Sequence, residues 1–428
     1  MYKKLRMYEN PHTPPSKKRY PPKNDESETD KDENEDGDTE PDQPELTTDD
    51  RPTTKKPGRK EGHEGTTRPK PESDIILDVT ECECPYCSSS LDEPERIETR
   101  TIEDISDKCS IEVTEFRIGY YSCDCCGEDV IANHPDCPDE GRFGNRVCVQ
   151  TTLLKFEDRL PHRKVKNALE RDYGLKVSIA TVLDLTRRTA DKLRSAYEKV
   201  LKMIRESDVL YVDETGMKVD GKQYWAWVFR NKDSILIVLR DSRGKGVLQE
   251  VLGDRFDGVM VCDGWRSYPS FTSNLQRCWS HLLREAKDLD SVEGKNLAEE
   301  LQEMYNELTD FVDREPPPHE RKKKKEEATT AMNEMIEQEW DKEETAKLVT
   351  KIERGMDHWF TFVTEENVEP TNNKAERALR EHVVIRKIIG TLRNEKGTYI
   401  HETVMSMLAT WKERDRNPYD EMMKILRS

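Results

Sequence analysis

Short apolar runs with a two-residue alternation fill the stretch between residues 208 and 280, and this pattern predicts a β-sheet. A helical repeat at 246–252 interrupts the series between the third and fourth runs. The pattern therefore predicts three consecutive strands, a crossover helix and two further strands. The predicted strands cover residues 209–213, 224–230, 234–239, 258–263 and 276–280.

Helical periodicity replaces this alternation on the amino-terminal side, between residues 150 and 207. One predicted helix ends at Gly174, and Ser178 suits the N-cap of the next helix, over 179–189. A longer helix, 190–205, then leads into the first strand. Helix, glycine-containing turn and helix is the order of a helix-turn-helix, and a helical hairpin with a purely structural role has the same pattern.

On the carboxy-terminal side, residues 282–364 are helical and highly charged. Apolar positions from 298 to 312 recur at intervals of three and four, and the prolines at 316–318 end that helix. The lysine run 322–325 starts a second long predicted helix, with apolar positions up to Trp359 along one side. These lysines either contact DNA phosphates or belong to a solvated surface. We interpret about 285–365 as an insertion, after which residues 370–373 cap a further helix.

The composition of the chain indicates that one part of it is too polar to pack into a hydrophobic core. Hydrophobic residues make up 33% of the 428-residue chain and charged residues 37%. Residues 1–72 are proline-rich, then acidic, then basic, which predicts a disordered tail that is plainly solvated or that mimics DNA. Fourteen acids and one lysine between 25 and 50 supply −13 of the net charge of −18, so the total excludes no nucleic-acid partner.

The distribution of apolar residues also bears on location. No apolar run approaches the roughly 18 residues of a membrane helix. The amino terminus lacks the apolar core of a signal peptide. We therefore expect a cytoplasmic protein without membrane contact. In such a chain the eleven cysteines, several spaced Cys-x-x-Cys, favour a metal site over disulfides.

Two Cys-x-x-Cys pairs lie within residues 73–147, which we predict to be a zinc-binding ribbon. Two such turns on adjacent hairpins give four thiolates the tetrahedral arrangement of a structural Zn²⁺ site. Cys125 could replace either cysteine of the second pair, and Cys82 could compete with the first cysteine of the first pair. The predicted zinc ligands are Cys84, Cys87, Cys123 and Cys126.

Three carboxylates stand at the ends of predicted elements. Asp213 and Asp263 each end an apolar strand, and Glu376 lies at the opening of a predicted helix. If the two strands are neighbours, both aspartates emerge at one edge of the sheet and Glu376 completes the set. Two Mg²⁺ ions roughly 3.5–4 Å apart, held by a few carboxylates, can serve phosphodiester cleavage and joining. Strand alternation directs Glu214 to the opposite face from Asp213, which favours Asp213 as the ligand.

Basic residues accompany these carboxylates in pairs. His281 and Arg284 are three residues apart and share a helix face, from which they contact the scissile phosphate or orient a metal ligand; a purely structural histidine is the alternative. Arg377 and Arg380 also share a helix face, beside Glu376. That pair suits phosphate contact or a salt bridge within the fold.

Several motifs around these residues resemble the insertion-sequence-66 family of Asp-Asp-Glu transposases. The resemblance covers roughly residues 58–420 and includes the segments 383–390 and 406–410. Thr371 departs from it, because the family motif is expected to carry Asp there. The other motifs are Val212-Asp-Glu-Thr-Gly216, Val219-Asp-Gly-Lys222 with Trp225, Cys262-Asp-Gly-Trp-x-x-Tyr268, Cys278-Trp-Ser-His-Leu-Leu-Arg-Glu285 and Asn372-Asn-Lys-Ala-Glu-Arg377.

The resemblance implies a mixed α/β fold with a ribonuclease-H-like catalytic core, in agreement with the predicted strand series. A zinc ribbon at 73–147 and a helical DNA-binding region at 148–207 would precede a catalytic domain at 208–428. Asp213, Asp263 and Glu376 would be the catalytic Mg²⁺ ligands. The partner would be double-stranded DNA, both at the transposon ends and at the target.

The family cuts at terminal inverted repeats to free a 3′-OH, which then attacks target DNA. A homodimer in the synaptic complex, associated with the nucleoid, follows by analogy. Two rival functions share these motifs: a catalytically silent DNA-binding protein derived from a transposase, and a nuclease of the same fold that cuts without joining.

Overall fold

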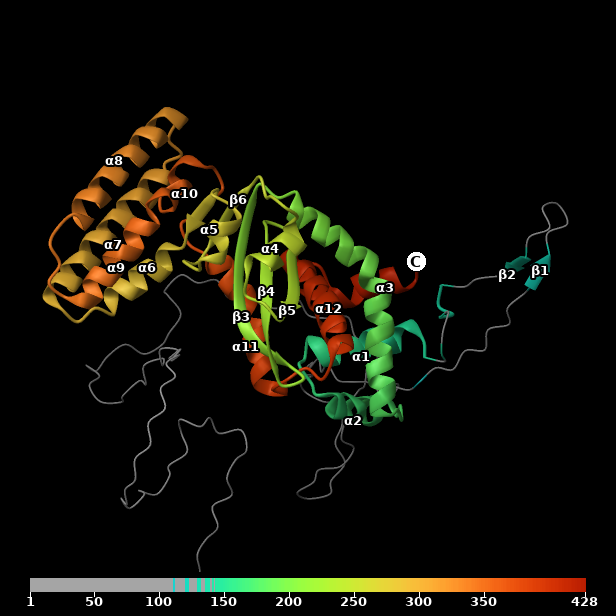
Figure 1. Cartoon of the computed structure of the whole chain (residues 1–428). Helices are drawn as coiled ribbons and strands as arrows, with labels where there is room; N and C mark the ends of the chain where they lie inside the picture. Colours follow the sequence, from blue (N-terminus) through green and yellow to red (C-terminus); the bar gives the residue numbers. More distant parts are fainter. Residues whose placement is uncertain (1–110, 112–119, 123–128, 132–134, 139–140, 142) are drawn as a thin grey trace, which may run out of the picture. The chain divides into compact units, whose positions relative to one another are not determined.

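The computed structural model describes residues 111, 120–122, 129–131, 135–138, 141 and 143–428. Within them the chain has a mixed α/β architecture, with helices in the majority (Figure 1). The predicted tail and all four predicted zinc ligands lie outside the described residues. The strands are β1 Tyr120–Ser122, β2 Asp129–Ile131, β3 Val209–Val219, β4 Lys222–Arg230, β5 Ile235–Arg240, β6 Val259–Cys262 and β7 Leu275–Arg277.

Five of these strands form one mixed sheet in the order β5-β4-β3-β6-β7. The pairs β5–β4 and β4–β3 are antiparallel, whereas β3–β6 and β6–β7 are parallel. Asp220 and Gly221 connect β3 to β4 with φ angles of 51° and 76°, as in a two-residue type I′ hairpin turn. Strands β1 and β2 form a separate antiparallel pair.

The structure corrects two predicted strand boundaries. β3 continues to Val219 instead of ending at Asp213, because its second half pairs along its whole length with β4. β7 ends at Arg277, since Trp279 already belongs to helix α6, Trp279–Lys287. The predictions for β4, β5, β6 and the crossover helix α4, Lys245–Leu252, are confirmed within one or two residues.

Helix α12, Glu395–Glu413, covers the β5 edge of the sheet with hydrogen bonds (Figure 1). Alternate backbone N–H groups of β5 donate to side chains of α12 that are one helical turn apart. The pairs are Ile235 to Thr410 at 3.0 Å, Ile237 to Ser406 at 2.8 Å and Leu239 to Glu402 at 2.7 Å. An edge strand covered in this way offers no free template for pairing with another chain.

Side chains alternate across the parallel half of the sheet and enter two hydrophobic cores. Leu210 and Met260 pack into a core shared with helices α3, Ile179–Arg205, and α12. Tyr211 and Val261 point the other way, into a core built with the insertion helices. The sheet is therefore buried on both faces, as expected of parallel strands.

The helical region before the sheet consists of α1 Asn145–Phe156, α2 His162–Tyr173 and α3. Gly174 ends α2 with φ 68°, and the Ser178 hydroxyl accepts the Thr181 N–H at 3.0 Å, so both predicted signals are confirmed. α3 is one helix of 27 residues, and the prediction of two helices meeting at 189–190 is wrong. No glycine or proline interrupts the chain there, and the buried residues follow one continuous face.

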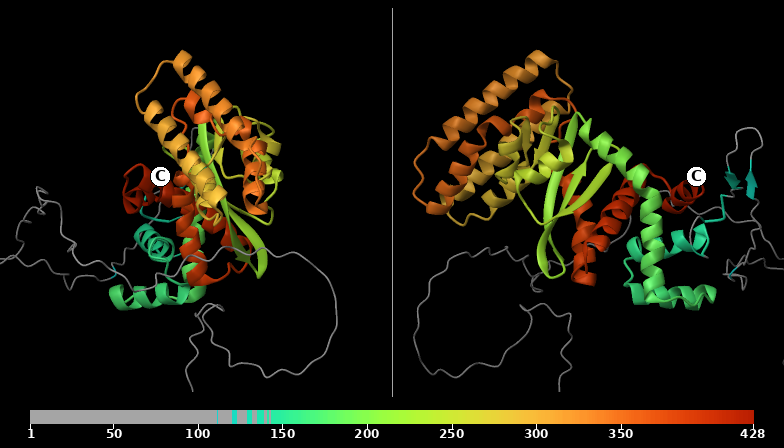
Figure 2. Two further views of the ribbon diagram at one scale, coloured as in Figure 1. Left: turned by 90° about the vertical axis from the view of Figure 1, so that its left-hand side faces the viewer. Right: turned by 45° about the vertical axis from the view of Figure 1, so that its right-hand side comes forward.

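Helices α7 to α10 fall within the range predicted as an insertion, 285–365, and α7, α8 and α9 lie side by side (Figure 2). The second predicted long helix is wrong, because α8 ends at Ile336 and α9 begins at Glu343. Glu293 accepts the backbone N–H groups of Asp341 and Lys342 at 3.2 and 2.8 Å and so fixes the break. The helices are α7 Val292–Val312, α8 Pro318–Ile336, α9 Glu343–Arg354 and α10 Thr361–Thr364.

The chain closes with α11 Asn373–Ile389, α12 and α13 Pro418–Leu426. A short helix, α5 Ser267–Phe271, follows β6, and a 3-10 turn, η2 Met356–His358, follows α9. Of the helices in the described part of the chain, none combines the length and apolar character needed to span a bilayer.

Gly258, just before β6, is a position where any side chain should break the parallel sheet. A Cβ there would lie 2.4 Å from the Ser207 carbonyl oxygen and 2.6 Å from that of Asp208. We expect Gly258→Ala to destabilise the fold by about 1–3 kcal/mol in urea unfolding. Gly246→Ala in α4, where a Cβ meets nothing within 4 Å, should be neutral or slightly stabilising. Equal effects of the two changes would contradict this account.

Candidate functional site

Asp213 and Asp263 stand at the same level of neighbouring parallel strands. Tyr211 on β3 lies opposite Val261 on β6, and each aspartate comes two residues later. Both side chains are half-buried. Asp263 directly follows β6, and its Oδ1 accepts the backbone N–H of Trp265 at 2.8 Å. The two carboxylates therefore come from fixed backbone positions on one side of the sheet.

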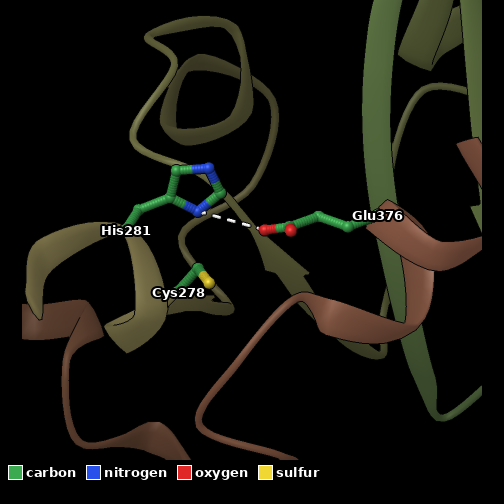
Figure 3. Close-up of side chains that lie close together, drawn as sticks. All are labelled: Cys278, His281 and Glu376. Carbon is green, nitrogen blue, oxygen red and sulfur yellow. Dashed lines mark ion pairs between the residues drawn. The ribbon is translucent and has the colours of Figure 1, made fainter. Parts of the chain in front are cut away.

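Glu376 reaches this place from the first turn of α11, and His281 reaches it from the first turns of α6. The His281 Nδ1 atom lies 3.5 Å from Glu376 Oε1 (Figure 3). Cys278, the residue before α6, completes a cluster whose ligand atoms all lie within 4.8 Å of one another. Interaction with the Cys278 side chain raises the pKa of His281 to about 9, against burial and with help from Glu376 and Asp263.

Asn372 ties these elements together from a fully buried position. Its Nδ2 donates to the Val212 carbonyl at 2.8 Å, immediately before Asp213. Its backbone N–H donates to Cys278 Sγ at 3.1 Å. The predicted side-chain cap of α11 is thus wrong, because the Asn372 side chain bonds to β3 instead of to its own helix. It holds Glu376 at a fixed distance along the chain from the strand that carries Asp213.

Glu214 has a different environment from its neighbour Asp213. Its side chain is completely buried and accepts hydrogen bonds from the Tyr268 hydroxyl and, at 2.6 Å, from Arg243 Nε. Arg243 also lies 4.0 Å from Asp263 and stacks over the ring of Trp265, with 3.9 Å to its centroid. Both Glu214 oxygens are occupied, which agrees with the preference for Asp213 as a ligand. Arg243 was not found from the sequence, because an arginine in a loop carries no pattern.

The carboxylates repel one another strongly. Burial, followed by the negative charges of Glu214, Asp263 and Glu376, raises the pKa of Asp213 to about 8. Burial and the charge of Asp263 also raise the pKa of Glu214, although Tyr268 and Arg243 oppose this. In addition, Glu376 Oε1 is buried without a hydrogen-bond partner among the described residues. Oxygen donors that repel one another in this way suit a hard divalent cation.

The predicted arginines lie at the outside of this cluster. Arg284, Arg377 and Arg380 are exposed. Arg377 Nε donates to the Asn373 carbonyl at 3.3 Å, and none of the three forms an ion pair with another residue that the structure describes. Their charges therefore remain open to solvent around Glu376 and His281.

Comparisons with known proteins place this geometry in a family context. Residues 140–399 match the family described as "Transposase IS66 family", a span of well over half the 428-residue chain. The chain is also 23% identical over 324 residues to the uncharacterized protein y4qI of Sinorhizobium fredii (strain NBRC 101917 / NGR234). That match covers 67% of this chain and 60% of the relative's own length.

Replacing Asn372 should loosen the junction between α11 and β3. We expect Asn372→Ala to lower the free energy of unfolding by about 1–3 kcal/mol, because the buried Val212 carbonyl loses its donor. Asn373→Ala, one position along and exposed, is the matched control and should change stability much less. If urea unfolding shows the same loss of unfolding free energy in both variants, Asn372 is not the anchor.

Replacing Asp213 should stabilise the metal-free protein in a pH-dependent way. Because the folded-state pKa is raised above its ordinary value of about 3.9, wild-type stability falls as pH rises toward about 8. In EDTA, Asp213→Asn should be about as stable as wild type near pH 4. Near pH 8.5 it should be about 1–3 kcal/mol more stable and melt a few degrees higher. The exposed Asp257→Asn serves as control, and a difference independent of pH would contradict the electrostatic cause.

Proposed function

The chain belongs to the IS66 transposase family, and we propose that it cleaves and joins DNA strands through Asp213, Asp263 and Glu376. The observation that carries this proposal is the equal level of Asp213 and Asp263 on adjacent parallel strands. Glu376 adds a third carboxylate from a helix that Asn372 fixes to the same strand. This arrangement supports an Asp-Asp-Glu triad.

We propose that these three carboxylates hold Mg²⁺. When bound, Mg²⁺ would stabilise negative charge on the phosphate and favour deprotonation of the attacking water or 3′-OH. Asp213 would contribute an oxygen from within β3, Asp263 one from the residue directly after β6, and Glu376 one from a helix start. The raised pKa of Asp213 supports the assignment. Burial and neighbouring negative charges disfavour its ionised form, and a bound cation would stabilise that form.

The exposed arginines support a DNA-facing role for the rim of the site. Arg377 and Arg380 lie one helical turn apart on α11, and Arg284 lies one turn beyond His281 on α6. Guanidinium groups free of internal ion pairs can bind phosphate oxygens. We assign these three residues to the DNA backbone next to the scissile phosphate. His281, already beside Glu376, would orient that carboxylate.

The order of the sheet supports a ribonuclease-H-like core. Three antiparallel strands, β5, β4 and β3, continue into two parallel strands, β6 and β7, with α4 as the crossover. The long helical insertion enters between β7 and α11, so the third carboxylate is distant in sequence from the other two.

The elements before the sheet are proposed to grip the transposon ends. α2 and α3, joined through Gly174 and Ser178, supply a helix-turn-helix-like unit with its own small core. The proposed zinc ribbon, with Cys84, Cys87, Cys123 and Cys126, would add a second contact to the terminal inverted repeats. Two copies of the chain would bring the two ends together.

The triad can be tested on linear DNA that carries a terminal inverted repeat. With Mg²⁺, Asp263→Ala should slow strand cleavage and strand transfer by at least about 100-fold, while end binding in a gel-shift assay is retained. Asp257→Ala, an exposed acid in the loop before β6, should leave both reactions intact. Undiminished joining by the Asp263→Ala protein contradicts the proposal, and cleavage without joining by wild type would indicate a nuclease.

A further inference from the structure

Cys278, His281 and Glu376 bring a thiol, an imidazole and a carboxylate together, and we refer to them as the mixed cluster. One ligand atom of each residue lies within 4.8 Å of the ligand atoms of the other two. Figure 3 shows the three side chains converging from the start of α6 and the start of α11. Their positions are fixed by the backbone around them, since Cys278 follows β7 and Asn372, which anchors the start of α11, donates its N–H to Cys278 Sγ at 3.1 Å.

Two donor atoms of the mixed cluster have no other role within the described fold. His281 Nδ1 and Glu376 Oε1 are both buried, and neither has a hydrogen-bond partner among the described residues. The two atoms form an ion pair with each other at 3.5 Å. Buried polar atoms are normally hydrogen-bonded, so an ion pair whose two atoms make no hydrogen bond indicates a place where a further group can bind.

We infer that the mixed cluster binds a borderline transition-metal ion such as Zn²⁺ through Cys278 Sγ, His281 Nδ1 and one oxygen of Glu376. Zinc takes sulfur, nitrogen and oxygen ligands at about 2.0–2.3 Å, which places tetrahedral ligand atoms roughly 3.3–3.6 Å apart. The separation of His281 Nδ1 from Glu376 Oε1 already falls in that range. Three protein ligands leave the fourth position to water.

The chemistry of the donors separates this site from the magnesium site. Thiolate and imidazole favour late transition metals, whereas Mg²⁺ prefers oxygen ligands. Glu376 is the residue that both sites would use. An ion in the mixed cluster would hold Glu376 away from Asp213 and Asp263, so Zn²⁺ would inhibit the Mg²⁺-supported reaction. This last step rests on the proposed function, whereas the binding step does not.

Binding is tested with Co²⁺ on the full chain. A cysteine ligand gives a sulfur-to-cobalt charge-transfer absorption, which can be titrated. Because the proposed zinc ribbon would also bind Co²⁺, the comparison is between variants. Cys278→Ser should bind one equivalent of Co²⁺ fewer than wild type. Cys148→Ser, which removes another buried thiol in α1, should bind the same number of equivalents as wild type. Wild-type stoichiometry and spectrum in Cys278→Ser overturn the inference.

A second variant guards against misfolding of Cys278→Ser. His281→Gln leaves the bond between the Asn372 N–H and Cys278 Sγ in place and removes the nitrogen ligand. It should bind Co²⁺ at the remaining thiolate at least about tenfold more weakly. Unchanged affinity in a His281→Gln protein that melts like wild type would also overturn the inference.

The shared carboxylate is tested through cleavage of terminal-repeat DNA. Micromolar Zn²⁺ added to the Mg²⁺ reaction should slow wild type by about tenfold or more, and should slow Cys278→Ser much less. Equal slowing of both proteins, or of neither, contradicts the sharing of Glu376. If wild type fails to cleave in Mg²⁺ alone, the proposed function is wrong, and the Co²⁺ titration still decides whether the mixed cluster binds a metal ion.

Discussion

The parallel, in-register pairing of β3 with β6 is the constraint on which the candidate site depends. It fixes Asp213 and Asp263 at one level of the sheet. Asn372 extends this constraint to a third element, because its buried side chain bonds to the Val212 carbonyl of β3. Glu376 inherits its position from that bond, one helical turn further on. Strand pairing thus fixes the positions of two of the carboxylates, and one hydrogen bond fixes the position of the third.

This placement brings negatively charged side chains close together, and positively charged residues of the fold offset their repulsion only in part. Arg243 pairs with Glu214, approaches Asp263 and stacks on Trp265, so it balances the side of the cluster that faces the loops. Among the residues that the structure describes, no cation forms an ion pair with Asp213, whose pKa rises to about 8. A site that holds like charges together is locally destabilising, which is a common cost of function. A divalent cation is the natural counter-charge, and Glu376 is where the two proposed kinds of ion would compete.

The sequence predicts the sheet well because alternation and β-branched residues mark each strand. It also predicts the α2–α3 turn, since Gly174 and Ser178 each have a specific backbone role. It misses the extension of β3, because Glu214, Thr215 and Gly216 directly after Asp213 are polar or small and their pairing with β4 is a tertiary effect. It misses the role of Asn372 for the same reason: an asparagine before a helix normally indicates a cap, and only the packed structure supplies the Val212 carbonyl as a competitor.

The central claim is that Asp213, Asp263 and Glu376 share a hard divalent ion, and the most direct test is Mn²⁺ binding followed by the electron paramagnetic resonance signal of the free ion. Mn²⁺ prefers the same carboxylate ligands as Mg²⁺. We predict that wild type removes free Mn²⁺ from solution and that added Mg²⁺ releases it. Asp213→Asn, Asp263→Asn and Glu376→Gln should each weaken this binding strongly, whereas Asp257→Asn should not. Unchanged Mn²⁺ affinity in the three folded variants would contradict the account.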